Sequence, residues 1–372
     1  MQSQARLVEM QDKLKPTVSI IIKTLNEQRH VTSAIESALA SLDEMDGEVI
    51  LADSASTDLT VRIAQKYPIK IVRLEHFGDR SCGVGAQLGF QYSSGRYLCL
   101  MDGDMRLRPG FLPAAIRFLE GNPRVGGVGG MIVECETDNR EFAQRMKRPD
   151  SDRQPGPVTR LDCSGVYRRT AIETIGYLTD RNLHAGEELD LGARLHARGW
   201  TLARIGLPAV DHHGHGGSAF RLLLRRFRTR ISFGMGEVVR AAVGQPHFWF
   251  VIRNDRKMPL CALVLGWWLA IMATPFLLGG AAGLLAVAGV ALFPFAVMWL
   301  RWRSLYDGIY SVAAWNLFTF SFLPGFLRSR VPPTLWIEST VVKQGPSPDA
   351  LAQWRSLSST AGESNTTEEV SA

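Results

Sequence analysis

The chain has 372 residues, of which 46% are hydrophobic, and it carries a formal net charge of +6. This length suits one large domain, alone or with a membrane segment, and the basic excess favours an anionic partner. The basic residues do not alternate with aromatic residues in a nucleic-acid-binding motif, which argues against nucleic acid as the anionic partner. The five cysteines have neither the CxxC spacing of a zinc site nor the even number of a disulfide framework.

Residues 1–15 are polar and charged, so we expect no signal peptide and an N-terminal domain that stays in the cytoplasm. Beyond them, short β-branched apolar runs predict buried strands, and the segments between have helical periodicity. The strands are expected at 18–22, 48–52, 69–74 and 97–101, and the helices at 31–42, 58–66 and 85–92. This alternation predicts an α/β fold with a mostly parallel sheet and helices on both faces.

Polar residues follow three of these strands, at Asn26-Glu27, Asp53 and Asp102-Gly103-Asp104. In parallel sheets, ligands bind beyond the carboxyl ends of the strands, so these residues are expected to form one site. Two carboxylates at i and i+2 suit Mg²⁺ or Mn²⁺ with a diphosphate, although turns also favour Asp and Gly. Asp53, at the end of the second strand, could accept a hydrogen bond from a nucleobase N–H or cap the next helix.

Two further clusters carry titratable side chains. Glu187, Glu188 and Asp190 open a helical pattern, where they could supply a general base or only complement the helix dipole. Three histidines at 212, 213 and 215 lie in a Gly-rich segment and could complete a metal site or be structural.

The chain divides into four parts. We expect a catalytic domain at 1–217 with a mobile loop at 150–157, a basic amphipathic segment at 218–258, a membrane region at 259–330, and a tail at 331–372 that is disordered beyond Gly345. Residues 220–243 alternate apolar residues with Arg, which predicts a helix in a membrane interface or a basic helix packed on the domain.

The membrane region contains two apolar segments, 259–278 and 281–300, each long enough to cross a bilayer. Basic residues flank the pair at 253–257 and 301–303, so the positive-inside rule predicts a hairpin with both ends in the cytoplasm. Residues 305–327 contain Asp307, Asn316 and Pro324, and they form either a third span or a re-entrant or interfacial segment.

Residues 16–220 resemble the family-2 glycosyltransferases of the GT-A (Rossmann-like) fold, with the motifs in the same order. The resemblance implies a nucleotide-sugar site made of Thr24, Asn26, Glu27, Asp53, Ser56, Arg80, Gly83 and Asp102. It implies metal ligands Asp102, Asp104, His212 and His213 for Mg²⁺ or Mn²⁺, and an acceptor side made of Ser164, Gly165, Tyr167 and Arg168 in a loop that begins at Cys163.

The pair Glu187-Glu188 stands where the family usually has Glu-Asp, so the resemblance implies Glu188 as the base, with Glu187 and Asp190 as the next candidates. Residues 225–230 only loosely resemble the Gln-x-x-Arg-Trp motif of processive synthases, and no Trp follows, which argues against processive polymer synthesis.

The implied function is an inverting, metal-dependent hexosyl transfer from a nucleotide-diphosphate sugar, a UDP-sugar before others, to a hydroxyl of a glycan or lipid-linked acceptor. The protein is expected to be multi-pass, in contact with membrane lipids, with its catalytic domain on the cytoplasmic face of a bacterial inner membrane and a role in polysaccharide or glycoconjugate biosynthesis.

Three alternatives stay open. A polyprenyl-phosphate glycosyltransferase has an ionised acceptor, so Glu188 would matter less there. A nucleotidyltransferase would have a Gly-rich, basic loop after the first strand, where this chain has Thr24-Leu25-Asn26-Glu27. A non-catalytic membrane scaffold would not need the acids.

Overall fold

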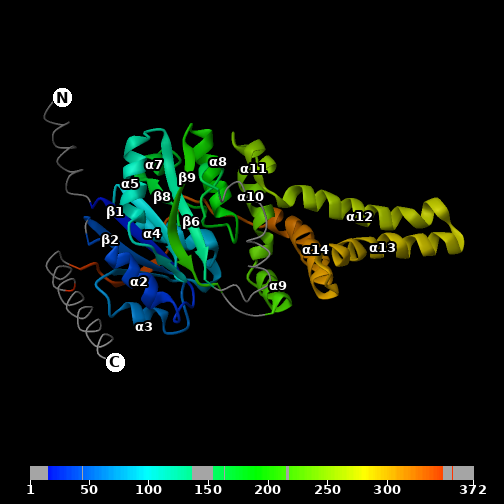
Figure 1. Ribbon diagram of the computed structural model, residues 1–372, viewed down its shortest axis with the longest axis horizontal. Coiled ribbons are helices and arrows are strands. Elements are labelled where there is room, and N and C mark those ends of the chain that lie inside the picture. The colour runs from blue at the N-terminus through cyan, green and yellow to red at the C-terminus, as the bar shows by residue number, and fades with distance from the viewer. Residues whose placement is uncertain are drawn as a thin grey trace.

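The computed structural model describes residues 16–43, 45–135, 154–162, 164–214, 218–346 and 354. The expectations for residues 1–15, for residues 150–153 of the 150–157 loop, for Cys163 and His215, and for the tail beyond 346 apart from residue 354 therefore lie outside the described residues. Figure 1 shows an α/β domain from which a long helical hairpin extends to one side.

A ten-stranded sheet forms the centre of the domain among the described residues, in the order β10-β3-β2-β1-β4-β8-β6-β9-β5, with β7 paired to β9. Strands β1 to β4 pair in parallel, and β8 and β10 pair antiparallel to their neighbours. The strands are β1 (Val18–Thr24), β2 (Gly47–Asp53), β3 (Lys70–Leu74), β4 (Tyr97–Asp102), β5 (Met105–Leu107), β6 (Val125–Glu134), β7 (Gly156–Val158), β8 (Val166–Arg168), β9 (Thr201–His212) and β10 (Ser339–Lys343).

Two apolar layers cover the two faces of this sheet. Side chains of β1 alternate between them, since Ile20 and Ile22 belong to one cluster and Ile21 to the other. The first layer includes α2 (Val31–Ala40), α3 (Thr60–Ala64) and α5 (Phe111–Gly121), and the second includes α4 (Cys82–Gln91), α7 (Arg169–Glu173) and α8 (Glu187–Ala197). The predicted fold class is therefore confirmed. In the second half of the sheet β6 and β9 pair in parallel, whereas β5, β7 and β8 pair antiparallel to their neighbours.

The predicted single helix over 220–243 is wrong. The structure has α9 (Ala219–Arg228), a 3₁₀ turn η3 (Ile231–Phe233) and α10 (Gly234–Ala242). The chain breaks at Arg230, whose φ of 62° lies in the left-handed region, which a helix interior does not use. Most of α10 is buried against α14, so only α9 keeps the exposed, basic character that the pattern predicted.

Helices α12 (Lys257–Leu278) and α13 (Gly280–Trp302) form the hairpin, and α11 (Phe248–Asn254) precedes it. Helices α12 and α13 are both long and apolar enough to cross a membrane. Only 11% of the apolar 18-residue stretch of each helix is buried. Helix α14 (Leu305–Leu327) returns to the domain, where Gly236 and Gly325 let α10, α14 and η3 approach closely. Beyond α14 the chain runs back along the domain and adds β10 to the free edge of β3.

Candidate active site

A cleft of about 720 Å³ opens at the carboxyl ends of β1 and β4. Six parts of the chain line it: the ends of these two strands, Ser54 after β2, the 77–85 segment that includes the start of α4, residues 184–188 at the start of α8, and residues 225–231 at and beyond the end of α9. The cleft thus brings together residues that are far apart in sequence, as expected for the ligand site of an open α/β sheet.

The acidic turn between β4 and β5 forms one wall. The ammonium nitrogen of Lys23, on β1, lies 2.9 Å from an Asp102 oxygen and 3.9 Å from a Glu187 oxygen. Between the two acids of the turn, Gly103 packs so closely on Thr24 that an added Cβ would lie 2.7 Å from its methyl group. A side chain there would displace the turn, so glycine fixes both carboxylates in the cleft.

Asp104 is the acid that meets a histidine. An Asp104 oxygen lies 3.5 Å from Nε2 of His212, and Nδ1 of the same ring lies 2.5 Å from a Glu134 oxygen. Burial lowers the pKa of His212, but the two carboxylates outweigh it and raise the pKa to about 10. His213 instead donates its backbone N–H to the backbone carbonyl oxygen of Asp104 over 2.9 Å and stacks its ring on His30.

Within the described part of the chain, no three His, Cys, Asp or Glu side chains form a ready-made metal site. The donor chemistry nevertheless fits Mg²⁺ or Mn²⁺, because the cleft offers carboxylates at Asp102 and Asp104, and the His212 ring beside the second could coordinate a metal on releasing its proton. A diphosphate would have to supply the remaining oxygen ligands. Between the two candidate histidines, this geometry favours His212 over His213.

Glu187 and Glu188 face the acidic turn from the start of α8, directly after Gly186, whose φ is 84°. Glu187 is buried, whereas Glu188 is partly exposed to the cleft. Desolvation and the neighbouring Glu187 carboxylate raise the pKa of Glu188 to about 8, and desolvation also raises the pKa of Glu187. A partly exposed carboxyl group with a raised pKa is suited to accept a proton.

Asp190 does not reach the cleft. It is buried and lies 2.7 Å from Nε of Arg194, one turn along α8, and this arginine also donates to the carbonyl oxygens of Tyr177 and Leu178. The acid therefore fastens α8 to the preceding loop, and its assignment as a candidate base is wrong.

The expected nucleotide residues form a network of turns. Asp53 has no exposed surface, and its oxygens accept hydrogen bonds from the Thr24 hydroxyl and the Ser56 N–H. Burial raises the pKa of Asp53 despite these bonds. Asn26, with a φ of 61°, accepts from the N–H of Thr57. Asp53 therefore stabilises this turn. Its contact with the nucleobase stays a prediction.

Three further members of the expected site can be placed. Glu27 lines the cleft, and its N–H donates to the Thr60 hydroxyl over 2.8 Å. Arg80 also lines the cleft and donates to the carbonyl oxygens of Ser54 and Ala55. Gly83 instead packs against the backbone of Asp180: a Cβ added at Gly83 would lie 2.0 Å from the Asp180 carbonyl oxygen. Gly83 thus seats α4 against a neighbouring loop rather than lining the cleft.

The acceptor-side prediction is wrong for one of its four residues, Arg168. Arg168 pairs with Tyr97 at the start of β4, the end opposite to Asp102, and donates to the Val125 carbonyl oxygen. Tyr167 is buried, and burial together with the nearby Glu188 carboxylate raises its pKa, so its place on the acceptor side stays a prediction. Ser164 and Gly165 lie toward the other end of β4, where the N–H of Leu100 donates to the Gly165 carbonyl oxygen. Their role stays a prediction.

The sequence reasoning missed several charged residues at the site. Lys23 was hidden inside an apolar strand, and Glu134 ends β6 beside His212. Arg225, Arg228 and Arg230 line the cleft, whereas their helical pattern had indicated contact with lipid. A helical pattern gives the face on which arginines lie but not the neighbouring element that this face meets.

The sheet, the acidic turn and the facing acids define a glycosyltransferase of the GT-A fold. The model of Glycosyl transferase family 2 matches residues 19–176, and EpsE from Bacillus subtilis, a protein named for glycosyltransferase activity, is 31% identical over 195 residues. That alignment covers 50% of this chain and 68% of EpsE. The chain belongs to glycosyl transferase family 2.

Other relatives are more distant. The Dolichol-phosphate mannosyltransferase of Pyrococcus furiosus is 28% identical over 133 residues, 35% of this chain and 37% of that protein. The mannosyltransferase PcManGT from Pyrobaculum calidifontis, solved with GDP-Man and Mn²⁺, has a TM-score of 0.53 and 17% identity and covers 83% of this chain and 88% of its own. The 1–349 fragment of TarS from S. aureus has a TM-score of 0.50 and 13% identity, covering 89% and 97%. These two structures share the fold.

Proposed function

We propose that this protein is an inverting glycosyltransferase that moves a sugar from a nucleotide-diphosphate sugar to a hydroxyl acceptor. The observation that carries the proposal is the pairing of two kinds of acid in one cleft. Asp102 and Asp104 stand at the strand ends, and Glu188 faces them from α8 with a raised pKa. Asp102 and Asp104 suit a metal-bound diphosphate, and Glu188 suits a general base.

In the proposed reaction, the acceptor oxygen forms a bond to the anomeric carbon while the bond from that carbon to the diphosphate oxygen breaks. Glu188 takes the proton of the attacking hydroxyl, and the nucleoside diphosphate leaves with the electron pair of the broken bond. Attack from the side opposite to the leaving group inverts the configuration at the anomeric carbon.

The residues present would hold the metal through Asp104 and His212, with Asp102 nearby. When bound, Mg²⁺ or Mn²⁺ would neutralise charge on the leaving diphosphate. Lys23 and Arg80 line the same cleft and add fixed positive charge for phosphate oxygens. The Mn²⁺ and GDP-Man in the PcManGT structure support this choice of ligands for a shared fold.

We further propose that α12 and α13 cross a membrane and that the α/β domain stands at its cytoplasmic face. The hairpin is exposed and apolar, and its two basic flanks lie together at the end next to the domain. An acceptor held in that membrane, such as a lipid-linked glycan in polysaccharide or glycoconjugate biosynthesis, would meet the cleft without leaving the bilayer.

A second candidate is transfer to a lipid phosphate such as polyprenyl phosphate. The observation that favours it is the group of three arginines, Arg225, Arg228 and Arg230, on the cleft wall. Helix α9, which carries Arg225 and Arg228, also exposes Leu224 and Phe227, so an anionic head and an apolar chain would both find partners. The name of the P. furiosus relative supports the same acceptor class.

A transfer assay with the purified full chain tests both candidates. UDP- and GDP-sugars are offered in turn with Mn²⁺, together with either a membrane glycolipid fraction or synthetic polyprenyl phosphate. Glycolipid product that inverts the donor's anomeric configuration supports the first candidate, and polyprenyl-phosphate product supports the second. A protein that neither binds nor cleaves any nucleotide sugar would contradict both.

A further inference from the structure

A buried histidine on the cleft wall is not used by the mechanism above. His184 has 5% of its surface exposed and lines the cleft three residues before Glu187. Glu237, on α10, holds it at two points: one carboxylate oxygen accepts the His184 backbone N–H over 2.8 Å, and the other lies 2.9 Å from ring Nδ1. This two-point contact fixes both the position of the loop and the orientation of the ring.

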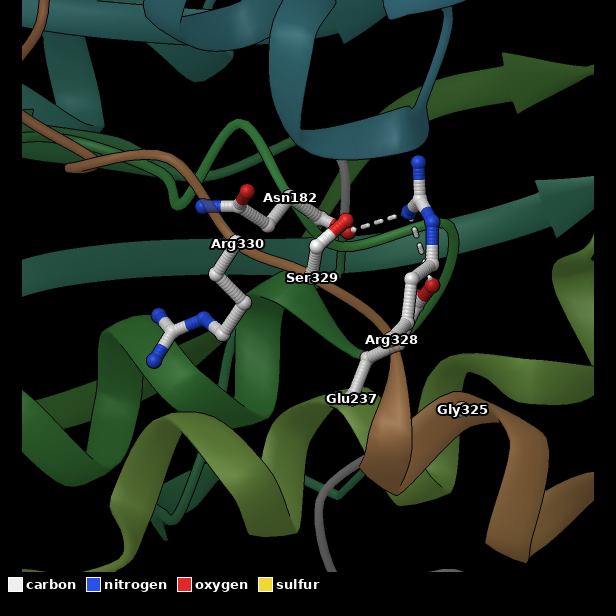
Figure 2. Close-up of a pocket in the computed structure, with 6 residues that line it drawn as sticks. All are labelled: Asn182, Glu237, Gly325, Arg328, Ser329 and Arg330. Atoms are coloured by element: carbon white, nitrogen blue, oxygen red, sulfur yellow. Dashed lines mark hydrogen bonds and ion pairs between the residues drawn. The ribbon is translucent and has the colours of Figure 1, made fainter.

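Helix α14 fixes Glu237 in turn. Arg328, just beyond the last turn of α14, lies 3.0 Å from the same Glu237 oxygen and donates to the carbonyl oxygen of Asn182 over 3.3 Å. Figure 2 shows Arg328 and Glu237 meeting beneath the loop that carries Asn182. The carboxylate is 4% exposed, and such a buried charge is tolerated only with partners of this kind.

The contact with Glu237 leaves Nε2 as the ring atom that a ligand can reach. Nδ1 lies 2.9 Å from Glu237, which only accepts hydrogen bonds, and 3.0 Å from Arg328, which only donates them, so this nitrogen already has a protein partner in either tautomer of the ring. A hydroxyl group is the matching partner, because it can donate to Nε2 or accept from it if the ring is protonated.

We infer that His184 binds a hydroxyl group of the donor's sugar, and that Glu237 and Arg328 are its positioning residues. The inference rests on the proposed function, since it requires a nucleotide sugar in the cleft. It adds a sugar-recognition residue that the sequence pattern did not indicate. It also gives the end of α14 a direct link to the ligand, through Arg328, Glu237 and His184.

Two substitutions separate binding of a ligand from simple support of Glu237. His184→Asn keeps a polar group where Nδ1 stands, so it can still meet Glu237, but it removes the atom at Nε2. His184→Gln places its amide near the Nε2 position instead. The measured quantity is the Kd of the nucleotide sugar divided by the Kd of its nucleoside diphosphate, because this ratio isolates the sugar.

Titration calorimetry of the full chain in detergent, with UDP-N-acetylglucosamine against UDP and GDP-mannose against GDP, gives the ratio for the pair that the wild-type protein binds. We expect His184→Asn to raise it about three- to tenfold, the range of one neutral hydrogen bond, and His184→Gln to leave it nearly unchanged. An unchanged ratio in both variants, or a rise only in His184→Gln, would overturn the inference. Wild-type protein that binds no nucleotide sugar would overturn the proposed function instead.

A matched pair of arginine variants tests the positioning role, and it serves even where His184→Asn does not fold. Arg328→Gln removes the contacts of Arg328 with Glu237 and with Nδ1 of His184, while Arg330→Gln removes the neighbouring ion pair with Asp180, which does not touch His184. Of these two variants, we expect only Arg328→Gln to raise the Kd ratio. An unchanged ratio in His184→Gln would serve as the control that the loop tolerates substitution. Equal ratios in the two arginine variants would overturn the positioning role.

Discussion

The ammonium nitrogen of Lys23 lies 2.9 Å from a carboxylate oxygen of Asp102. The same nitrogen lies 3.9 Å from Glu187, so one cation stands between the strand-end acids and the acids of α8. Lys23 lines the cleft and therefore supplies a positive charge there beside the acidic turn.

We therefore expect Lys23→Met to weaken binding of a nucleoside diphosphate about ten- to hundredfold, the range for a hydrogen bond to a charged group. Lys23→Arg keeps the charge and should lose less. Calorimetric titration at fixed Mn²⁺ measures both variants. Wild-type affinity in Lys23→Met would show that the lysine serves only to neutralise the neighbouring acids.

Transfer should require a divalent cation. EDTA should abolish the reaction and added Mn²⁺ or Mg²⁺ should restore it, because the leaving diphosphate needs its charge neutralised. Glu134→Gln provides a sharper test, since Glu134 orients the ring of His212. We expect the Mn²⁺ concentration for half-maximal activity to rise about 10- to 100-fold in this variant. Full activity in EDTA would contradict the metal assignment.

Glu188→Gln should lose transfer to a hydroxyl acceptor by about 10²- to 10⁴-fold while it binds the donor nearly normally, because the amide keeps the shape but cannot take a proton. Single-turnover transfer and donor titration provide the two measurements. Glu187→Gln is the matched comparison: if it loses more transfer than Glu188→Gln, the base is Glu187. Near wild-type activity of Glu188→Gln with polyprenyl phosphate would instead favour the second candidate function.

The raised pKa of Glu188 gives the reaction a pH dependence of definite sign. Glu188 can act as a base only as a carboxylate, and with a pKa of about 8 this form is the minor one at neutral pH. The rate of transfer should therefore increase between about pH 6 and pH 9, and this increase should disappear in Glu188→Gln. A flat profile in the wild-type protein would assign the proton transfer to another group.

Asp53→Ala should lower both stability and nucleotide affinity. The substitution leaves the Ser56 N–H and the Thr24 hydroxyl without their buried acceptor, which typically costs about 1–3 kcal/mol of unfolding free energy. Denaturant unfolding and nucleotide titration check the two effects. Weaker binding with unchanged stability would restore Asp53 as a direct contact to the base.

Local sequence patterns were sufficient to predict the elements around the acidic turn. The strands around Ile20, Leu51 and Leu100 are short β-branched or apolar runs, and the structure has a strand at each of these positions. Helix α4 starts three residues before its predicted start because the Ser81 hydroxyl accepts the N–H of Val84 and caps it. The sequence alone does not single out Ser81 as a cap, because many other serines in the chain could have the same role.

The missing parts of the site depend on tertiary contacts. Asp190 and Glu188 are two residues apart on one helix, and only the packing of α8 decides that the first meets Arg194 and the second meets the cleft. Arg168 belongs to a strand whose antiparallel pairing with β4 sends it away from Asp102. The break at Arg230 follows from a left-handed residue that apolar periodicity cannot reveal.

Strand β10 has a consequence for biosynthesis. Ser339 of β10 pairs with Leu74 of β3, although all three long helices lie between them in the chain. While the protein is being made, β3 therefore presents an unpaired edge until the hairpin and α14 have been synthesised. Exposed strand edges pair readily with other chains. A premature stop after α14 would leave that edge open permanently, so such a fragment should aggregate even though every residue of the cleft is present.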